Sequence, residues 1–336
     1  MGPRLVSFDP GLHAPVGGAV SASAYERYLG RWSRLFVPSL LAAAGITAGH
    51  RVLDIATGTG EAAMGALPLV GDTGVVVGAD ISAAMLAAAC ARLPKVYRAV
   101  VTDGQALAFR DASFDAVLCQ LCLMFFPDPA RGLAEFRRVL RPGRRAAVCV
   151  ISTAEKAPMW GVLAEALSRR LPDRREMLNL SFSLSDPDRL EQMLGSAGFH
   201  DINVAIEMRQ GVVESFDEFW APIEAGVGSL PLTYRALPEP ERRAVQRGGA
   251  ITIRVGWAAG DEPQDADRVG PGLEDAGACR RSLEASTRKP KPRDTGAGDG
   301  QPDVARDMAG YPCGQRNDGG ALSGPKQTGS EERWRT

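Results

Sequence analysis

The residues best placed to do chemistry lie in the segment VLDIATGTGE (52–61), where a short apolar run ends in a turn with two glycines. Gly58 and Gly60 let the backbone turn tightly and approach a ligand, because they carry no Cβ. In open parallel sheets, ligands bind outside the carboxyl ends of the strands, where the strand order reverses. A Gly-x-Gly turn alone is a weak signal, so a tight turn without a ligand is the alternative interpretation.

Two carboxylates follow this turn at the ends of further apolar runs. Asp80 ends a β-branched run twenty residues after Gly60, and its carboxylate can accept hydrogen bonds from both hydroxyls of a ribose. Ser82 already supplies an N-cap for the next helix, which weakens the interpretation of Asp80 as a capping residue. Asp103, at the start of Asp103-Gly104-Gln105, can accept a hydrogen bond from an adenine amino group. Each turn taken singly could be an ordinary strand end, but three in succession predict a nucleoside site.

Alternating apolar runs and helical patterns must position these turns. We expect strands at residues 51–56, 74–80, 98–103, 113–120 and 144–152. Residues 130–143 carry apolar side chains at the period of a helix, which Pro142-Gly143 should end. Strands that alternate with helices of this length predict a parallel sheet covered on both faces. Farther along we expect a helix at 185–197, a strand at 202–208, and a helix opened by a capping box at Ser215 and Glu218.

Five segments of the chain resemble class I methyltransferases. They read VLDIATGTGE, GADIS, TDGQALAF, SFDAVLCQLCLMFFPDP and FRRVLRPGRR. The resemblance spans roughly residues 24–250 and is strongest to the type 11 group, which includes the enzymes that C-methylate ubiquinone and menaquinone precursors. It implies an α/β, Rossmann-like, doubly wound and mainly parallel seven-stranded sheet with helices on both faces. It also implies S-adenosylmethionine as the cofactor.

The resemblance assigns cofactor-binding roles residue by residue. Asp54, Ala56 and Gly58 would line the methionine and ribose side, with Gly60 completing the turn. Asp80 and Ile81 would hold the ribose, and Met85 would lie nearby. The adenine would be held by Asp103, Gly104 and Gln105, while Gln120 and Leu121 would sit beneath the methionine part. Tyr25 or Arg31 would close over the cofactor's carboxylate.

The chain departs from the family pattern in three places. Ala56 replaces a frequent glycine, which is tolerable if this residue has an ordinary φ. Arg144 replaces the second glycine of the usual Pro-Gly-Gly turn and predicts a different turn geometry. Gly248-Gly249 interrupts the helix that family members usually continue at this point.

Two other function classes compete with methyl transfer. A nicotinamide-dependent oxidoreductase would need the third glycine of a Gly-x-Gly-x-x-Gly turn, where this chain has Ala63. Glu61 also brings negative charge to the start of the helix, where a pyrophosphate would bind. A protein that binds the cofactor without catalysis is the second alternative. No motif nominates a general base, so the catalytic residues are not assigned.

Composition sets the domain boundaries. Residues 1–23 are rich in Gly and Pro and should be flexible, and residues 24–255 should form the methyltransferase domain. Within it, residues 153–185 and 210–235 should supply the lid and acceptor elements. Residues 256–336 are low in large apolar side chains, so we expect a disordered tail that adds nothing to the fold.

The remaining composition bounds the partners and the location. The net charge is −1, without a basic stripe, which argues against nucleic acid as a partner. The absence of a long apolar run or a secretory signal predicts a soluble, cytoplasmic protein. We expect a small, partly apolar acceptor. Its pocket could be lined by Trp160, Phe182, Phe219 and Trp220, although apolar residues at helical spacing more often belong to the core. No metal site is expected, and Cys90, Cys119, Cys122 and Cys149 should be buried free thiols.

Overall fold

The computed structural model of the chain describes residue 25 and residues 29–209, 213, 215–226, 228–257 and 311–312. The described elements fall into two units. The first contains every element from α2 to α11 together with β6, and the second contains the helix α12. The N-terminus predicted to be flexible (1–23) lies outside the described residues. So does the predicted tail (256–336), apart from residues 256–257 and 311–312.

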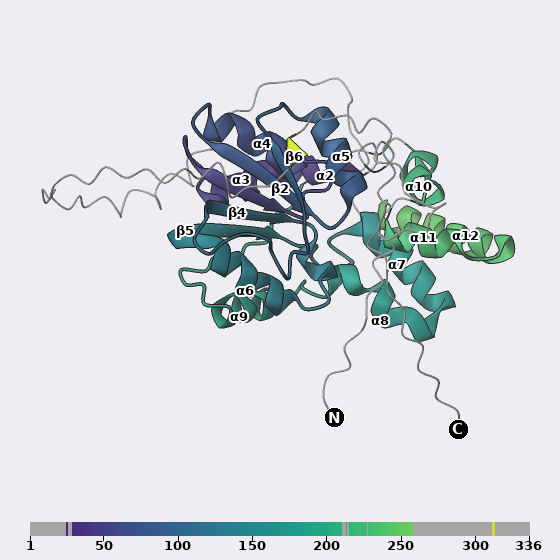
Figure 1. Cartoon of the computed structure of the whole chain (residues 1–336). Helices are drawn as coiled ribbons and strands as arrows, with labels where there is room; N and C mark the ends of the chain where they lie inside the picture. Colours follow the sequence, from purple (N-terminus) through teal and green to yellow (C-terminus); the bar gives the residue numbers. More distant parts are fainter. Residues whose placement is uncertain are drawn as a thin grey trace, which may run out of the picture. The chain divides into compact units, whose positions relative to one another are not determined.

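Five parallel strands form the sheet of the first unit (Figure 1). They are β1 (Arg51–Ile55), β2 (Val75–Asp80), β3 (Arg98–Val101), β4 (Phe114–Gln120) and β5 (Leu140–Cys149). Their order is β5-β4-β1-β2-β3, and the two-residue strand β6 (Tyr311–Pro312) pairs antiparallel with β3. The predicted parallel α/β fold is confirmed. The prediction of seven strands is wrong for the described residues, and β6 lies within the stretch predicted to be a disordered tail (256–336).

The strand order reverses at β1. The chain runs from β1 through β2 to β3 on one side, and then returns to β4 and β5 on the other. Both β1 and β4 are buried along almost their whole length, as expected of parallel strands covered on two faces. The reversal places the carboxyl ends of β1, β2 and β4 around one crevice, which is where such sheets bind ligands.

Helices cover both faces of the sheet, as predicted (Figure 1). On one face lie α3 (Val37–Ala44), α4 (Glu61–Val70) and α5 (Ala83–Arg92), which share a hydrophobic core with alternate residues of the strands. On the other face, α6 (Pro129–Val139) packs against β5, and α9 (Pro187–Ser196) packs against α6. The core of the first face includes Leu40, Val52, Ala66, Val76 and Leu118, all of them buried.

Local capping explains where these helices begin. The Ser82 hydroxyl accepts a hydrogen bond from the Met85 N–H at the start of α5, as the sequence predicts. Asp128 and Asp186 cap α6 and α9 in the same way, each followed by a proline in the first turn. The expected start of the α9 helix at Ser185 is therefore two residues too early.

The predicted end of the α6 helix is wrong by several residues. We expected the helix to continue to Pro142-Gly143, but it ends at Val139, and Leu140 pairs with Phe114 in the sheet. Leu140 is buried, so its apolar character serves the strand rather than the helix. Helical and strand periods overlap at this single residue, and only the pairing with β4 decides between them.

A second wrong prediction is the strand at 202–208. This segment alternates apolar and polar residues but has no regular secondary structure, and Ile206 and Met208 are exposed. The Glu207 carboxylate instead accepts a hydrogen bond of 2.5 Å from the Ser39 hydroxyl in α3. A strand requires a partner that supplies a hydrogen-bonded ladder, and an alternating pattern does not provide one.

The remaining helices of the first unit lie beyond the carboxyl ends of the strands, where α7 packs against α8 and α11, and α10 against α11. Their bounds are α2 (Arg31–Ser33), α7 (Pro158–Arg170), α8 (Arg175–Leu178), α10 (Phe216–Glu224) and α11 (Ser229–Arg235). Short 3₁₀ turns occupy η2 (Arg34–Phe36), η3 (Leu123–Phe125), η4 (Pro172–Arg174) and η5 (Leu180–Phe182). The Ser215 half of the predicted capping box is confirmed, since the Ser215 hydroxyl accepts a hydrogen bond from the Glu218 N–H. The Glu218 carboxylate pairs with Arg31.

The second unit contains the helix α12 (Glu239–Trp257). It continues through Gly248-Gly249, so the expectation that this pair interrupts the helix is wrong. Two glycines cost a helix about 1 kcal/mol each relative to alanine, which a helix of 19 residues can tolerate. None of the described helices is long and apolar enough to cross a membrane.

Candidate functional site

The turn after β1 is held by a buried carboxylate, that of Asp54. Asp54 is 1% exposed, and one of its oxygens, Oδ2, accepts hydrogen bonds from the Thr57 hydroxyl (2.7 Å) and the Ala63 N–H (3.0 Å). Burial raises the pKa of Asp54 to about 7. Asp54 therefore ties the turn to the first turn of α4, and it does not line the cavity described below.

The turn itself requires left-handed backbone at three positions. Gly58 has a φ of +54° and Gly60 a φ of +89°, which glycine adopts without strain. A Cβ on Gly60 would also lie 2.7 Å from the Leu93 side chain. Ala56 has a φ of +54°, so the expectation of an ordinary φ at this position is wrong. The frequent family glycine would suit this backbone better, because left-handed φ is strained for an L-residue.

Asp80 joins the turn to the end of β2. Its Oδ2 accepts a hydrogen bond of 2.9 Å from the Gly58 N–H, and its Oδ1 accepts one of 2.8 Å from the Ser82 N–H. Burial raises its pKa, and the backbone N–H groups of Ser82, Gly58 and Ile81 oppose this rise. A carboxylate has about four lone-pair positions, so Asp80 keeps acceptor capacity for a ligand.

The loop after β3 is fixed by a glutamine and by an aromatic ring. The Gln105 side chain accepts a hydrogen bond from the Asp128 N–H (2.8 Å), and the Gln105 backbone N–H donates to Asp103 Oδ1 (2.9 Å). A Cβ on Gly104 would lie 2.5 Å from the Phe126 ring, and one on Gly132 would lie 2.6 Å from it. Gly104 therefore leaves room for a ring that lines the cavity, which explains the glycine by packing rather than by φ.

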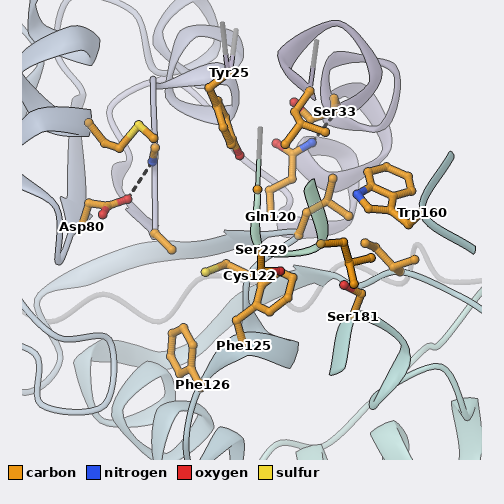
Figure 2. Close-up of a pocket in the computed structure, with 18 of the residues that line it drawn as sticks. Tyr25, Ser33, Asp80, Gln120, Cys122, Phe125, Phe126, Trp160, Ser181 and Ser229 are labelled. Carbon is orange, nitrogen blue, oxygen red and sulfur yellow. Dashed lines mark hydrogen bonds between the residues drawn. The ribbon is translucent and has the colours of Figure 1, made fainter. Parts of the chain in front are cut away.

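The end of β4 contacts the N-terminal segment. The Gln120 side chain donates a hydrogen bond of 2.6 Å to the Ser33 carbonyl, which spans 87 residues of sequence. Leu121 follows with a φ of +54°, a strained conformation at the edge of the cavity. Tyr25 reaches the same region from the N-terminal side, with its ring pointing down between Asp80 and Gln120 (Figure 2). Burial raises the pKa of the Tyr25 phenol above its ordinary range, so it stays protonated.

These residues surround a single cavity of about 420 Å³ at the carboxyl ends of the strands. This size lies within the range of small-molecule sites, roughly 300–1,000 Å³. Eleven of the predicted site residues line it: Tyr25, Ala56, Gly58, Asp80, Ile81, Met85, Asp103, Gly104, Gln105, Gln120 and Leu121. Asp54, Gly60 and Arg31 do not line it.

Arg31 and Glu61 are occupied by ion pairs. Arg31 lies 2.8 Å from Glu218 at the start of α10, and its guanidinium stacks on Trp32. Glu61, 8% exposed, contacts Arg34 (3.1 Å) and Arg92 (2.9 Å). The negative charge that the sequence places at the start of α4 is therefore compensated by two arginines.

The other end of the cavity is lined mainly by apolar residues from α7, α10 and α11. Trp160 and Phe219 were anticipated from the sequence and line it, whereas Phe182 and Trp220 do not. Trp220 is 1% exposed and packs edge-on against Tyr234. Sequence reasoning missed the lining residues Cys122, Phe125, Phe126, Ile151, Met159, Leu163, Ser181 and Leu230. Of these, Cys122, Phe125 and Phe126 follow the β4 strand directly, which was the available signal.

The cysteines form no metal centre in the described part of the chain. No group of three or more His, Cys, Asp or Glu residues there could hold a metal ion. Cys119, Cys122 and Cys149 are free thiols, and Cys119 is fully buried. Cys90 is disulfide-bonded, so the expectation of a free thiol is wrong at this position.

Comparison with known proteins agrees with this geometry. A family model described as "Methyltransferase domain" matches residues 53–148, from β1 to the end of β5. The demethylmenaquinone methyltransferase of Renibacterium salmoninarum is 34% identical over 185 residues, covering 52% of this chain and 74% of the relative. The enzyme of the same name from Mycolicibacterium vanbaalenii is 40% identical over 187 residues, covering 55% and 77%. The chain belongs to the S-adenosylmethionine-dependent methyltransferases.

Within these methyltransferases, the chain falls in the ubiquinone/menaquinone C-methyltransferase group. A further relative, the ubiquinone/menaquinone biosynthesis C-methyltransferase of Pseudoalteromonas translucida, is 31% identical, covering 49% of this chain and 72% of the relative. The resemblance read from the sequence is thus confirmed, with S-adenosylmethionine as the methyl donor. These relatives give no support to a nicotinamide-dependent oxidoreductase or to a binding protein without catalysis.

Proposed function

We propose that the cavity holds S-adenosylmethionine at its polar end and a small, quinone-type acceptor at its apolar end. The observation that carries the proposal is the pair of carboxylates Asp80 and Asp103, which follow adjacent strands and line one cavity. Asp80 keeps acceptor capacity for a ribose hydroxyl, and Asp103 offers an acceptor for the adenine amino group. Met85 and Ile81 add apolar contacts on the same side.

Most other residues of the predicted site support the cofactor either by shaping the turn or by lining the cavity. Asp54 and Gly60 shape the turn that carries Gly58, through hydrogen bonds and through close packing respectively. Gln120 and Leu121 lie at the end of β4, where the methionine part would rest. Tyr25 covers this region from the N-terminal segment, whereas Arg31 acts on the α10 helix through Glu218.

The apolar end of the cavity supports the acceptor assignment. The predicted lid elements, 153–185 and 210–235, supply Met159, Trp160 and Leu163 from one side and Phe219 and Leu230 from the other. Such a wall suits a flat, partly apolar molecule better than a charged polymer. Two of the relatives are named for demethylmenaquinone, and we extend this acceptor type to the present chain.

Catalysis in this cavity is mainly a matter of positioning. When bound, the cofactor supplies a methyl group on a sulfonium, whose departure as a neutral thioether needs no acid. The chain's part is to align the acceptor and to exclude water, which can supply roughly 7–11 kcal/mol. Tyr25 and Cys122 cannot act as bases, because burial raises the pKa of both, that of Cys122 to about 12.

The test is methyl transfer to a defined acceptor. Purified protein is incubated with methyl-labelled S-adenosylmethionine and a short-chain demethylmenaquinol, and the label in the quinone fraction is measured. We expect methylated quinol that appears only with the protein, and a lower rate of its formation by Asp80→Asn at a cofactor concentration that does not saturate the variant. Cofactor binding together with no label in the quinol would contradict the acceptor assignment and leave the cofactor assignment standing.

A further inference from the structure

Ser181 and Trp160 supply hydrogen-bond donors at the apolar end of the cavity. Ser181 lies in the turn η5 between α8 and α9 and is 4% exposed, and Trp160 lies in the first turn of α7. Both line the cavity. Neither side chain makes a hydrogen bond within the described part of the chain. Figure 2 shows the Ser181 hydroxyl and the Trp160 indole on the same side of the cavity, across from Asp80.

The Ser181 side chain is buried as a whole, but its hydroxyl oxygen is open to the cavity rather than enclosed without a partner. The neighbouring Ser183 differs, since its hydroxyl donates to the Met124 carbonyl at 3.4 Å. Because the Ser181 hydroxyl faces the cavity and makes no hydrogen bond to the described part of the chain, it is free to donate to a bound molecule.

The carboxylates of the cavity lie elsewhere. Among the described lining residues, Asp80 and Asp103 are the acidic ones, and they follow β2 and β3. Ser181 and Trp160 come instead from the elements that cover the apolar end. The two donors therefore lie at the acceptor end of the cavity rather than at the nucleoside end. An oxygen atom on the acceptor would accept hydrogen bonds from them.

We propose that Ser181 is a specificity-determining residue that donates a hydrogen bond to a hydroxyl or carbonyl oxygen on the aromatic ring of the acceptor. The Trp160 N–H contributes a second donor to the same ring. This inference rests on the proposed function, because it concerns the acceptor end of the same cavity. A fixed oxygen orients the ring in its plane and thereby selects which ring carbon faces the cofactor, so Ser181 acts by positioning.

The experiment uses two probes of the same shape, 1-naphthol and naphthalene, which differ by one oxygen. Protein saturated with S-adenosylhomocysteine is titrated with each probe by calorimetry. We expect the wild type to bind 1-naphthol about tenfold more tightly than naphthalene, the size of one ordinary hydrogen bond. Ser181→Ala should remove most of this preference and leave naphthalene binding unchanged, while Ser181→Thr should retain it.

Ser183→Ala is the matched control, because it removes a hydroxyl two residues away that donates to the protein itself. It should keep the preference for 1-naphthol. The inference is overturned if Ser181→Ala keeps the preference, or if it weakens both probes equally, which is the mark of a merely structural role. A wild type without the preference overturns it as well. These outcomes are independent of quinol methylation, so failure of the proposed function shows separately in the labelling assay.

Discussion

Replacing Asp54 by asparagine should change how the stability of the protein depends on pH. Asp54 is fully buried beneath the glycine turn, and burial raises its pKa from the ordinary 3.8 to about 7. The folded state therefore binds this proton more tightly than the unfolded state does. Below pH 3.8 both states are protonated, so stability is unaffected there, and it falls as the pH rises from about 4 to about 7.

The magnitude follows from the two pKa values. Their difference of about three units, at roughly 1.4 kcal/mol per unit, gives a loss of about 4 kcal/mol in the free energy of unfolding. The amide introduced by Asp54→Asn cannot ionise, so the variant should not show this loss. The amide oxygen can still accept from Thr57 and Ala63, which share one oxygen in the wild type. The amide nitrogen is buried, at a cost of about 1–3 kcal/mol at every pH if it finds no acceptor.

The assay is urea unfolding followed by tryptophan fluorescence at several values between pH 4.5 and pH 8. We expect Asp54→Asn to be less stable than the wild type at the acidic end and to gain up to about 4 kcal/mol relative to it by pH 8. The control is Asp115→Asn. Although burial opposes it, the Arg51 N–H and Arg141 hold the pKa of Asp115 below its ordinary range, so its effect should be constant above pH 4.5. Parallel pH profiles for wild type and Asp54→Asn would refute the reasoning.

Three further predictions concern the backbone and the tail. Ala56→Gly relieves a left-handed φ of +54° and should raise the free energy of unfolding by about 0.5–1 kcal/mol. This figure already subtracts the extra entropy of glycine in the unfolded chain. An unchanged or lower melting temperature would count against the prediction. Gly104→Ala places a Cβ 2.5 Å from the Phe126 ring, so it should lower the free energy of unfolding by about 1–3 kcal/mol and weaken cofactor binding. Gly248→Ala in α12, where a Cβ meets open space, should leave this free energy unchanged or raise it. A chain ending after Trp257 loses only the two-residue strand β6 from the described sheet. Its cofactor affinity in calorimetry should therefore match that of the full chain. Loss of cofactor binding would show that the later residues are structural.

Local sequence signals predicted the elements that carry the candidate site. The apolar runs before Gly58, Asp80 and Asp103 form adjacent parallel strands, and the cap at Ser82 is where it was expected. These predictions succeed because strand pattern, turn residues and caps act within a few residues. The same locality explains the eleven predicted residues that line the cavity, since parallel strands bring their carboxyl ends together.

The misses depend on contacts between distant segments. Leu140 belongs to a strand because Phe114 pairs with it, and residues 202–208 lack a ladder while Glu207 bonds to Ser39. Neither partner can be read from the local pattern. Arg31 was expected at the cofactor, but it pairs with Glu218, which is 187 residues away. Ser181 was missed for the same reason, because its position in the cavity wall depends on how α7, α8 and α9 pack.

The central claim is that the cavity holds S-adenosylmethionine through Asp80, and cofactor titration calorimetry tests it most directly. The wild type should bind S-adenosylmethionine and S-adenosylhomocysteine and should not bind nicotinamide dinucleotides. Asp80→Asn should weaken both nucleosides by about 1–3 kcal/mol, because hydrogen bonds to a charged group are lost. Asp111→Asn, which changes an exposed carboxylate paired with Arg138, should leave the affinity unchanged. Equal affinity of the wild type and a folded Asp80→Asn variant would contradict the account, as would a preference for the dinucleotide.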